Sequence, residues 1–206
     1  WVPWLATNYE WKNDNRKLIF SIRTGVKWSD GREFSAYDVA YTLNLWKQFP
    51  ALDTRNAWDY LQNVVAISDT LVEVDFKRVY VPGFEAIAGA YIVPKHIWSK
   101  LDDPLKFDNP DPVGTGPYTE VLRFNSQVWE LGKNHNYWQK GKPHVEKLIF
   151  PTFSTNEQTT LALLSGNLDW AGAFIPAIQR IFVDKNPEHH HYWFRNTGYS
   201  TFLHTN

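Results

Sequence analysis

The stretch that decides the fold is residues 17–38, which read KLIFSIRTGVKWSDGREFSAYD. The first seven of these residues alternate between two faces, with Leu18, Phe20 and Ile22 together on one face. A period of two in apolar side chains is typical of a half-buried β-strand. We therefore predict a strand over Lys17–Arg23 that turns this face toward a core.

A turn and a helix are expected directly after this strand. Asp30-Gly31 is a turn signal, because both residues suit tight backbone turns. Ser35 suits a helix N-cap, and Asp38 follows at the acidic position of an approximate capping box. Three apolar residues at helical spacing indicate one buried face: Val39, Leu43 and Trp46. Phe49-Pro50 ends the predicted helix.

The periodicity of apolar residues and the positions of turn-forming residues predict the remaining elements. We expect a short helix or an extended stretch at Ala57–Val65, a hairpin of Ala66–Thr70 and Leu71–Phe76, helices at Pro82–Ala90 and Pro94–Trp98, a loop at Leu101–Pro112, strands at Thr119–Arg123, Gln127–Lys133 and His144–Pro151, a helix from Ser154 or Thr155 to Leu164 with Leu161 and Leu164 inward, a short buried strand at Leu168–Ala171, a helix at Ile175–Val183, and strands at His191–Phe194 and Tyr199–Leu203. Hairpins interspersed with helices indicate an α/β or α+β class with a mixed sheet.

Composition narrows the classes of protein. The 206 residues carry a net charge of -1, which gives no basic stripe for a nucleic acid, and 43% hydrophobic residues suit a globular chain. The absence of cysteine excludes disulfides and thiolate metal sites. The chain opens without an initiator Met and ends within an expected strand, so we expect a fragment or a processed chain.

Six motifs in a fixed order resemble the family 5 extracellular solute-binding proteins of bacterial ABC importers. They are the opening phrase Leu5-Ala6 with Tyr9-Glu10-Trp11, the strand and turn from Phe20 to Gly31 with the helix start at Phe34–Val39, Ile92–His96, Val113–Tyr118, Asn134–Trp138 and Leu163–Asp169. Any one of these motifs alone is weak, whereas the ordered set spans nearly the whole chain.

The resemblance implies a fold, a function and partners. The implied fold is a lobe of a type II periplasmic binding protein, α/β in class, with a mixed sheet, flanking helices and a hairpin-rich subdomain. Residues 1–206 would form most of the first lobe of a two-lobed protein, with a smaller subdomain at about 26–112 and the sheet and helices at about 113–206. The implied partners are a small-molecule ligand, the membrane permease of an ABC transporter and the second lobe of the same protein; no cofactor, metal or nucleic acid is implied. The implied location is periplasmic or extracellular, membrane-associated through the importer.

Two ligand classes and one enzyme class remain as alternatives. An oligosaccharide binder uses Trp or Tyr platforms with neutral polar partners, whereas a peptide binder fixes charged termini with ionic side chains. The 11 Trp favour the oligosaccharide, and the sequence around Trp170 and Tyr192-Trp193 resembles the oligosaccharide-binding branch of the family. A glycan-active hydrolase would need two facing carboxylates, for which 22 Asp and Glu leave room. No Gly-x-Ser-x-Gly or His-Glu-x-x-His motif occurs.

Four aromatic residues are the candidate ligand contacts. Trp58 lies in a segment that resembles the stretch from which family members reach the ligand with an aromatic side chain. Trp170 follows the turn at Gly166-Asn167 and precedes the small residues Ala171-Gly172, which leave room for a ligand. Tyr91 and Tyr199 lie near segments that approach the cleft in the family. Each of the four also fits a core position, and a core Trp would cost stability on replacement where a platform Trp would cost binding.

The run His189-His190-His191 invites a metal-site interpretation. Neighbouring residues of a strand point to opposite faces, so three in a row do not converge on one ion. We therefore expect these histidines to enter a strand as a solvated loop.

Overall fold

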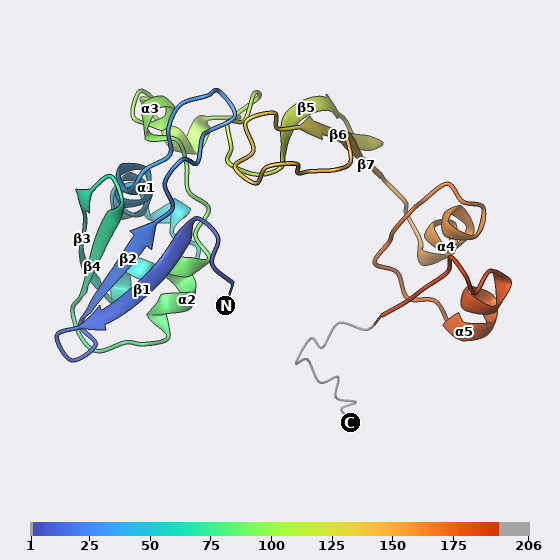
Figure 1. The fold of residues 1–206 in the computed structure, drawn as a ribbon, viewed down its shortest axis with the longest axis horizontal. Helices are drawn as coiled ribbons and strands as arrows, with labels where there is room; N and C mark the ends of the chain where they lie inside the picture. The colour runs from blue at the N-terminus through green and yellow to red at the C-terminus, as the bar shows by residue number, and fades with distance from the viewer. Residues whose placement is uncertain (1, 194–206) are drawn as a thin grey trace. The chain divides into compact units, whose positions relative to one another are not determined.

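The computed structural model describes residues 2–193 of the chain, and Figure 1 shows their arrangement. The strands are β1 (Ala6–Lys12), β2 (Lys17–Ile22), β3 (Leu61–Ser68), β4 (Leu71–Phe76), β5 (Tyr118–Phe124), β6 (Val128–Lys133) and β7 (Lys147–Pro151). The α-helices are α1 (Ala36–Gln48), α2 (Gly83–Ala88), α3 (Lys95–Trp98), α4 (Asn156–Leu164) and α5 (Ile178–Ile181), and single 3-10 turns are η1 (Pro50–Leu52), η2 (Ala57–Asp59), η3 (Pro104–Lys106) and η4 (Val183–Lys185). The chain divides into two units at Phe150–Pro151. No helix among residues 2–193 is long and apolar enough to cross a membrane.

The first unit is built on a four-stranded sheet of order β1-β2-β4-β3. All three strand pairs are antiparallel, so this sheet lacks the parallel pair of the mixed sheet that we predicted. Tight hairpins impose this direction on the β1–β2 and β3–β4 pairs, because two strands joined by a short turn must run in opposite directions. Leu18, Phe20 and Ile22 are buried on one face of β2, as the alternation predicts.

The strand at the sheet edge next to β2 is absent from the prediction. The stretch around Tyr9-Glu10-Trp11, which we expected to precede the first strand, is itself β1. Its residues are mostly exposed, so hydrophobic alternation gives little signal. Because β1 pairs with β2 and β2 pairs with β4, the sheet of the predicted 26–112 subdomain also contains residues 6–22.

Helix α1 begins where the sequence predicts. Ser35 accepts a hydrogen bond from the Tyr37 backbone N–H, and the Asp38 side chain accepts one from the Ser35 backbone N–H, which completes a capping box. The helix ends before Phe49-Pro50 and packs against β3 and β4. Leu43 on its inner face is fully buried.

The buried carboxylate of Asp38 does more than cap α1. Its Oδ2 also lies 3.5 Å from the indole Nε1 of Trp28, and its Oδ1 accepts a hydrogen bond of 3.0 Å from the Lys95 backbone N–H at the start of α3. Trp28 is 1% exposed and meets Phe34 edge to face. Asp38 therefore joins the 25–31 turn, α1 and α3 within the core.

A second sheet, of order β5-β6-β7, completes the first unit. β7 begins at Lys147, three residues after the predicted start. The turn before β5 contains two glycines, Gly114 and Gly116. Neither Gly114 nor Gly116 has a positive φ. Gly114 exchanges hydrogen bonds with Ser29 instead, through its backbone N–H and its carbonyl.

The second unit contains α4 and α5. Thr155 caps α4 and Gly166 ends it with a φ of 73°, as predicted. The buried face differs, because Ala162 and Leu163 are inward while Leu161 is 68% exposed. The face that α4 buries is decided by a small cluster in which Leu163 packs with Ile175 and Phe182. The last two residues lie outside the helix, so the sequence of the helix gives no signal of this contact.

The rest of the second unit is less regular than predicted. Residues 168–171, expected as a buried strand, have no regular structure. The helix predicted at Ile175–Val183 is a single turn that starts after Ala177, whose φ of 47° interrupts helical geometry. Residues 191–193 form no strand, and the strand predicted at Tyr199–Leu203 lies outside the described residues.

Replacement of Asp38 tests the capping and bridging carboxylate. Asp38→Ala leaves the donors of Ser35, Trp28 and Lys95 without their acceptor, so we expect a loss of about 3 kcal/mol or more in the free energy of unfolding. Asp38→Asn retains one acceptor oxygen and should lose about 1–2 kcal/mol. Urea denaturation followed by circular dichroism measures both values. Asp69→Ala, at an exposed carboxylate, should change the value by less than about 0.5 kcal/mol.

The ion pairs of Glu130 in the second sheet should make the stability of the fold depend on pH. This carboxylate on the middle strand accepts a 2.6 Å hydrogen bond from Lys147 on β7 and pairs with Arg123 on β5. The hydrogen bond from Lys147 is the main cause that lowers the pKa of Glu130 below its usual value. A lowered folded-state pKa stabilises the fold above the unfolded pKa and loses that effect as the pH falls through the folded value.

We therefore expect Glu130→Gln to lower the urea midpoint at pH 7 and to have a smaller effect at pH 3. The unfolded carboxyl titrates near pH 4.3, and the loss begins there. Glu146→Gln is the matched control, because Glu146 pairs with Lys133 at an exposed position. An equal effect of Glu130→Gln at both pH values would contradict this account.

Candidate functional site

An open cleft beside Tyr91 is the part of the first unit that best fits a ligand site. Its volume is about 340 Å³, which lies within the range of small-molecule pockets. Three aromatic side chains line it, and so do one cation and two hydroxyl groups: Trp46, Tyr91, Trp98, Arg55, Thr42 and Thr54. We refer to it as the Tyr91 cleft.

The segment that carries Tyr91 is fixed to α1 while its side chain stays open. The Thr42 hydroxyl donates to the carbonyl of Asp38 at 2.8 Å and accepts from the Val93 backbone N–H at 3.0 Å. The Tyr91 side chain itself is 91% exposed. An exposed ring on a fixed backbone offers a ligand contact area at low cost in conformational entropy.

Trp98 lies on α3, and acidic side chains hold the first two residues of this short helix. Asp38 accepts from the Lys95 backbone N–H, and the His96 ring lies 2.6 Å from the Asp30 carboxylate. Burial tends to raise the pKa of Asp30, but hydrogen bonds from the Arg32 backbone N–H and from His96 hold it below its usual value. Asp30 therefore remains an anion that can hold α3 in place.

Arg55 is positioned by the loop between η1 and η2. Asp53 accepts hydrogen bonds from the backbone N–H groups of Ala57 (2.8 Å) and Trp58 (2.9 Å), which closes this loop. The charge of Asp53 also acts on Tyr60, whose pKa is raised to about 12, mainly by burial and then by this nearby carboxylate. Arg55 donates to the Glu85 carbonyl, and a Cβ at Gly89 would lie 2.6 Å from the Arg55 guanidinium. Glycine at 89 thus allows the close approach of this cation.

The structure places the four predicted ligand residues in different surroundings. Tyr91 lines the cleft, whereas Trp58 does not; its indole N–H donates to the Leu43 carbonyl at 2.6 Å, and Lys47 lies over its ring. Trp170 belongs to the second unit and is 64% exposed. Tyr199 lies outside the described residues. The ligand roles of all four residues stay proposals.

The structure brings to the cleft three residues for which the sequence predicts no ligand role: Trp46, Trp98 and Arg55. Trp46 was assigned to the buried face of its helix, and its half-buried position shows why that pattern is ambiguous. Arg55 follows no motif, and its place depends on the Asp53 loop. No local pattern marks such a residue.

The histidine run has structural contacts. The ring of His190 stacks on Phe182 with 4.2 Å between centroids, and its Nδ1 lies 2.8 Å from the Phe182 carbonyl oxygen. Within residues 2–193, no three His, Asp or Glu side chains gather as a metal site would require. His190 thus has a packing role in the second unit.

The fold defines the class of the protein. A solved periplasmic oligopeptide-binding protein of Thermotoga maritima, crystallised with mannohexaose, has a TM-score of 0.82 and 27% identity; the match covers 96% of this chain and 37% of that one. The fold is therefore that of the type II periplasmic binding proteins, and the predicted α/β class is confirmed.

The family follows from the sequence. The chain belongs to the bacterial extracellular solute-binding proteins of family 5, because the model "Bacterial extracellular solute-binding proteins, family 5 Middle" matches residues 1–206. It is 33% identical to Protein XP55 of Streptomyces lividans over 166 residues, or 80% of this chain and 30% of that protein. It is 28% identical to the oligopeptide-binding protein OppA of Bacillus subtilis over 193 residues, or 82% of this chain and 34% of that protein. The chain thus spans about a third of the length of these relatives.

Replacements of Tyr91, Trp58 and Trp170 separate exposed from structural aromatic residues. Tyr91→Ala and Trp170→Ala should each change the free energy of unfolding by less than about 0.5 kcal/mol, because both rings are exposed. Trp58→Ala should cost about 2–4 kcal/mol, because a half-buried ring, a hydrogen bond and a cation–π contact are lost together. If Trp58 served only as a ligand platform, Trp58→Ala would have little effect on stability. The contacts of Trp58 in the structure lead us to expect a larger loss.

Urea denaturation of the three variants measures these differences. Tyr91→Phe and Trp58→Phe are the matched controls, since each keeps an aromatic ring at its position. A loss at Tyr91→Ala as large as at Trp58→Ala would show that the Tyr91 ring is packed in solution.

Proposed function

We propose that the chain is part of the substrate-binding component of an ABC importer. This component would capture an oligosaccharide outside the cytoplasmic membrane and deliver it to the permease. The similarity to the mannohexaose-bound Thermotoga protein over 96% of the chain is the observation that favours an oligosaccharide. Residues 1–206 would supply most of the first lobe, and the second lobe would close over the ligand. The protein would act in the periplasm or outside the cell.

The Tyr91 cleft supports this ligand class through its chemistry. Exposed aromatic rings can stack on the apolar faces of sugar rings, while the exposed hydroxyl group of Thr54 can bond a sugar hydroxyl. Closure of the lobes would shift the population toward the closed form, driven by contacts made only in that form.

An oligopeptide is the alternative ligand within the same fold. The Bacillus relative is named an oligopeptide-binding protein, and so is the Thermotoga protein that holds mannohexaose. A peptide needs a carboxylate partner for its amino terminus and a cation for its carboxyl terminus. The cleft supplies the cation Arg55, but no Asp or Glu is among its lining residues.

A binding role is favoured over glycan hydrolysis. Hydrolysis of a glycosidic bond requires two carboxyl groups on opposite sides of the bond. The lining of the Tyr91 cleft contains neither Asp nor Glu, so the cleft offers no such pair. We therefore propose that the protein releases its ligand unchanged.

Thermal unfolding with a ligand panel tests the proposal. The panel consists of gluco-, manno- and xylo-oligosaccharides and short peptides, added to the full-length protein. A ligand at 100 times its Kd adds about 2.7 kcal/mol of stability, so we expect one oligosaccharide class to raise the Tm by several degrees. Stabilisation by peptides alone would contradict the oligosaccharide assignment.

Two further measurements refine the test. Tyr91→Ala should weaken binding of the stabilising oligosaccharide by about tenfold, whereas Tyr91→Phe should retain most of the affinity, because the ring supplies the stacking area. Chromatography of the ligand after prolonged incubation should recover it intact. Shortened products would show that the protein is a hydrolase.

A further inference from the structure

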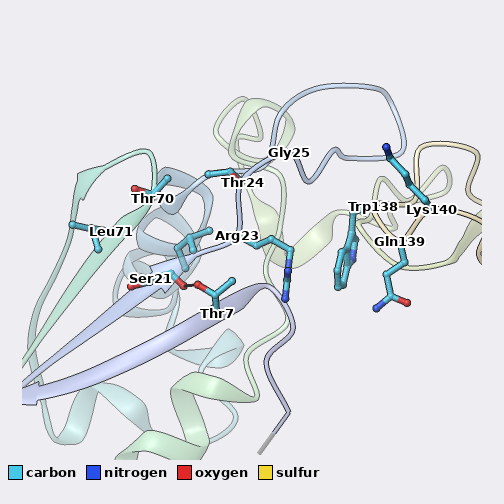
Figure 2. A pocket seen from close by; sticks show the side chains of 11 residues that line it. Thr7, Ser21, Arg23, Thr24, Gly25, Thr70, Leu71, Trp138, Gln139 and Lys140 are labelled. Atoms are coloured by element: carbon cyan, nitrogen blue, oxygen red, sulfur yellow. Dashed lines mark hydrogen bonds between the residues drawn. The ribbon is translucent and has the colours of Figure 1, made fainter.

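A second groove in the first unit is separate from the Tyr91 cleft and shares none of its lining residues. It lies at one end of the four-stranded sheet, between β1, β2 and β4 and the loop of residues 134–140 (Figure 2). Its volume is about 790 Å³. Its polar lining includes Ser21, Arg23, Thr24, Gln139 and Lys140, and we refer to it as the Arg23 groove.

Arg23 is held in one orientation by two neighbours. Its Nε donates a 2.7 Å hydrogen bond to the Trp4 carbonyl, and its guanidinium carbon lies 4.4 Å from the centroid of the Trp138 ring. Figure 2 shows the guanidinium beside that ring. The two terminal nitrogens form no hydrogen bond or ion pair within residues 2–193. The Arg23 fork is therefore fixed in place but has free donors.

The loop that carries Trp138 is also fixed. Asn134, which is buried, donates to the Gly116 carbonyl and accepts from the Asn136 backbone N–H, and Asn136 donates to the Ser29 carbonyl. The Trp138 ring meets Trp4 edge to face at 5.3 Å. Its Nε1 is the one buried side-chain nitrogen or oxygen of the described residues that lacks a partner.

The charges of the groove have one sign. Arg23 and Lys140 are both cations, and no Asp or Glu is among the lining residues. Lys140 is exposed and forms no ion pair among residues 2–193, and the hydroxyls of Ser21 and Thr24 have no hydrogen-bond partner there. Cations and hydroxyl donors that converge without a counter-charge favour an anionic ligand.

We infer that the Arg23 groove binds the oxyanion group, carboxylate or phosphate, of an extended ligand, with Arg23 as a bidentate donor and Lys140 as a second cation. The planar guanidinium fork matches the two oxygens of such a group, and its fixed plane lowers the entropy lost on binding. A single ion fills only a small part of 790 Å³, so the anion is one end of a longer molecule. Stacking of a neutral sugar on this face of Trp138 is disfavoured, because Arg23 covers it.

Nuclear magnetic resonance of the full ¹⁵N-labelled chain tests the inference. The probes are inorganic phosphate, citrate and triglutamate, each titrated at low ionic strength because screening weakens such contacts. We expect saturable shifts of the Arg23 Nε–H and the Trp138 indole N–H. Phosphate alone would assign the site to phosphorylated ligands, and citrate or triglutamate alone to carboxylates; either result supports the inference.

Variants identify the residues responsible. Arg23→Gln should weaken binding of the active probe by about tenfold or more, Arg23→Lys by less, and Lys140→Gln by about threefold, because charge-assisted bonds are lost. Arg78→Gln is the matched control, since Arg78 also lies over an aromatic ring, that of Tyr80, but outside the groove. It should leave the affinity unchanged.

Lys140→Gln keeps the test decisive if Arg23→Gln disturbs the fold, because Lys140 is exposed and forms no ion pair among residues 2–193. Circular dichroism of each variant reports such a disturbance. The inference is overturned if no probe gives a saturable shift, if Arg78→Gln weakens binding as much as Arg23→Gln, or if folded Arg23 and Lys140 variants bind like the parent.

Discussion

The buried carboxylate of Asp38 is the contact on which much of the first unit depends. One side chain, 5% exposed, accepts hydrogen bonds from the Ser35 and Lys95 backbones and from the Trp28 indole. A buried carboxylate destabilises the fold unless its oxygens accept hydrogen bonds. The segments that supply these donors therefore stabilise one another, and the loss of one segment would destabilise the others. The geometry of the helix start is thereby transmitted to α3, and with it to Trp98 at the Tyr91 cleft.

A second set of hydrogen bonds, made by Ser29 in the 25–31 turn, has a comparable effect. Ser29 exchanges bonds with Gly114 and accepts one from Asn136, so the turn after β2 is tied to the second sheet and its loop. Residues more than 80 positions apart in the chain are joined by this contact. It brings Trp138 against Arg23, and the Arg23 groove exists because of it.

Both candidate sites combine fixed backbones with open side chains. Thr42 fixes the segment of Tyr91, and Asn134 fixes the loop of Trp138, while the Tyr91 ring and the terminal nitrogens of Arg23 stay available. Such an arrangement suits a binding protein, because little order remains to be created when a ligand arrives. The chemistry of the two sites differs: the Tyr91 cleft is aromatic with neutral hydroxyls beside one cation, whereas the Arg23 groove has paired cations.

The sequence by itself determined the family, the α/β class and the local elements whose signals are short-range. The strand at β2, the capping box of α1 and the glycine stop at Gly166 all depend on residues a few positions apart. It proposed Trp58, Trp170, Tyr91 and Tyr199 as ligand residues, but it could not show that Trp58 is anchored to Leu43 or that Tyr91 lines a cleft. The tertiary structure alone decided the edge strand β1, the buried face of α4 and the neighbours of Arg23. These depend on contacts between distant segments, and a local pattern does not record which distant segment will supply the partner.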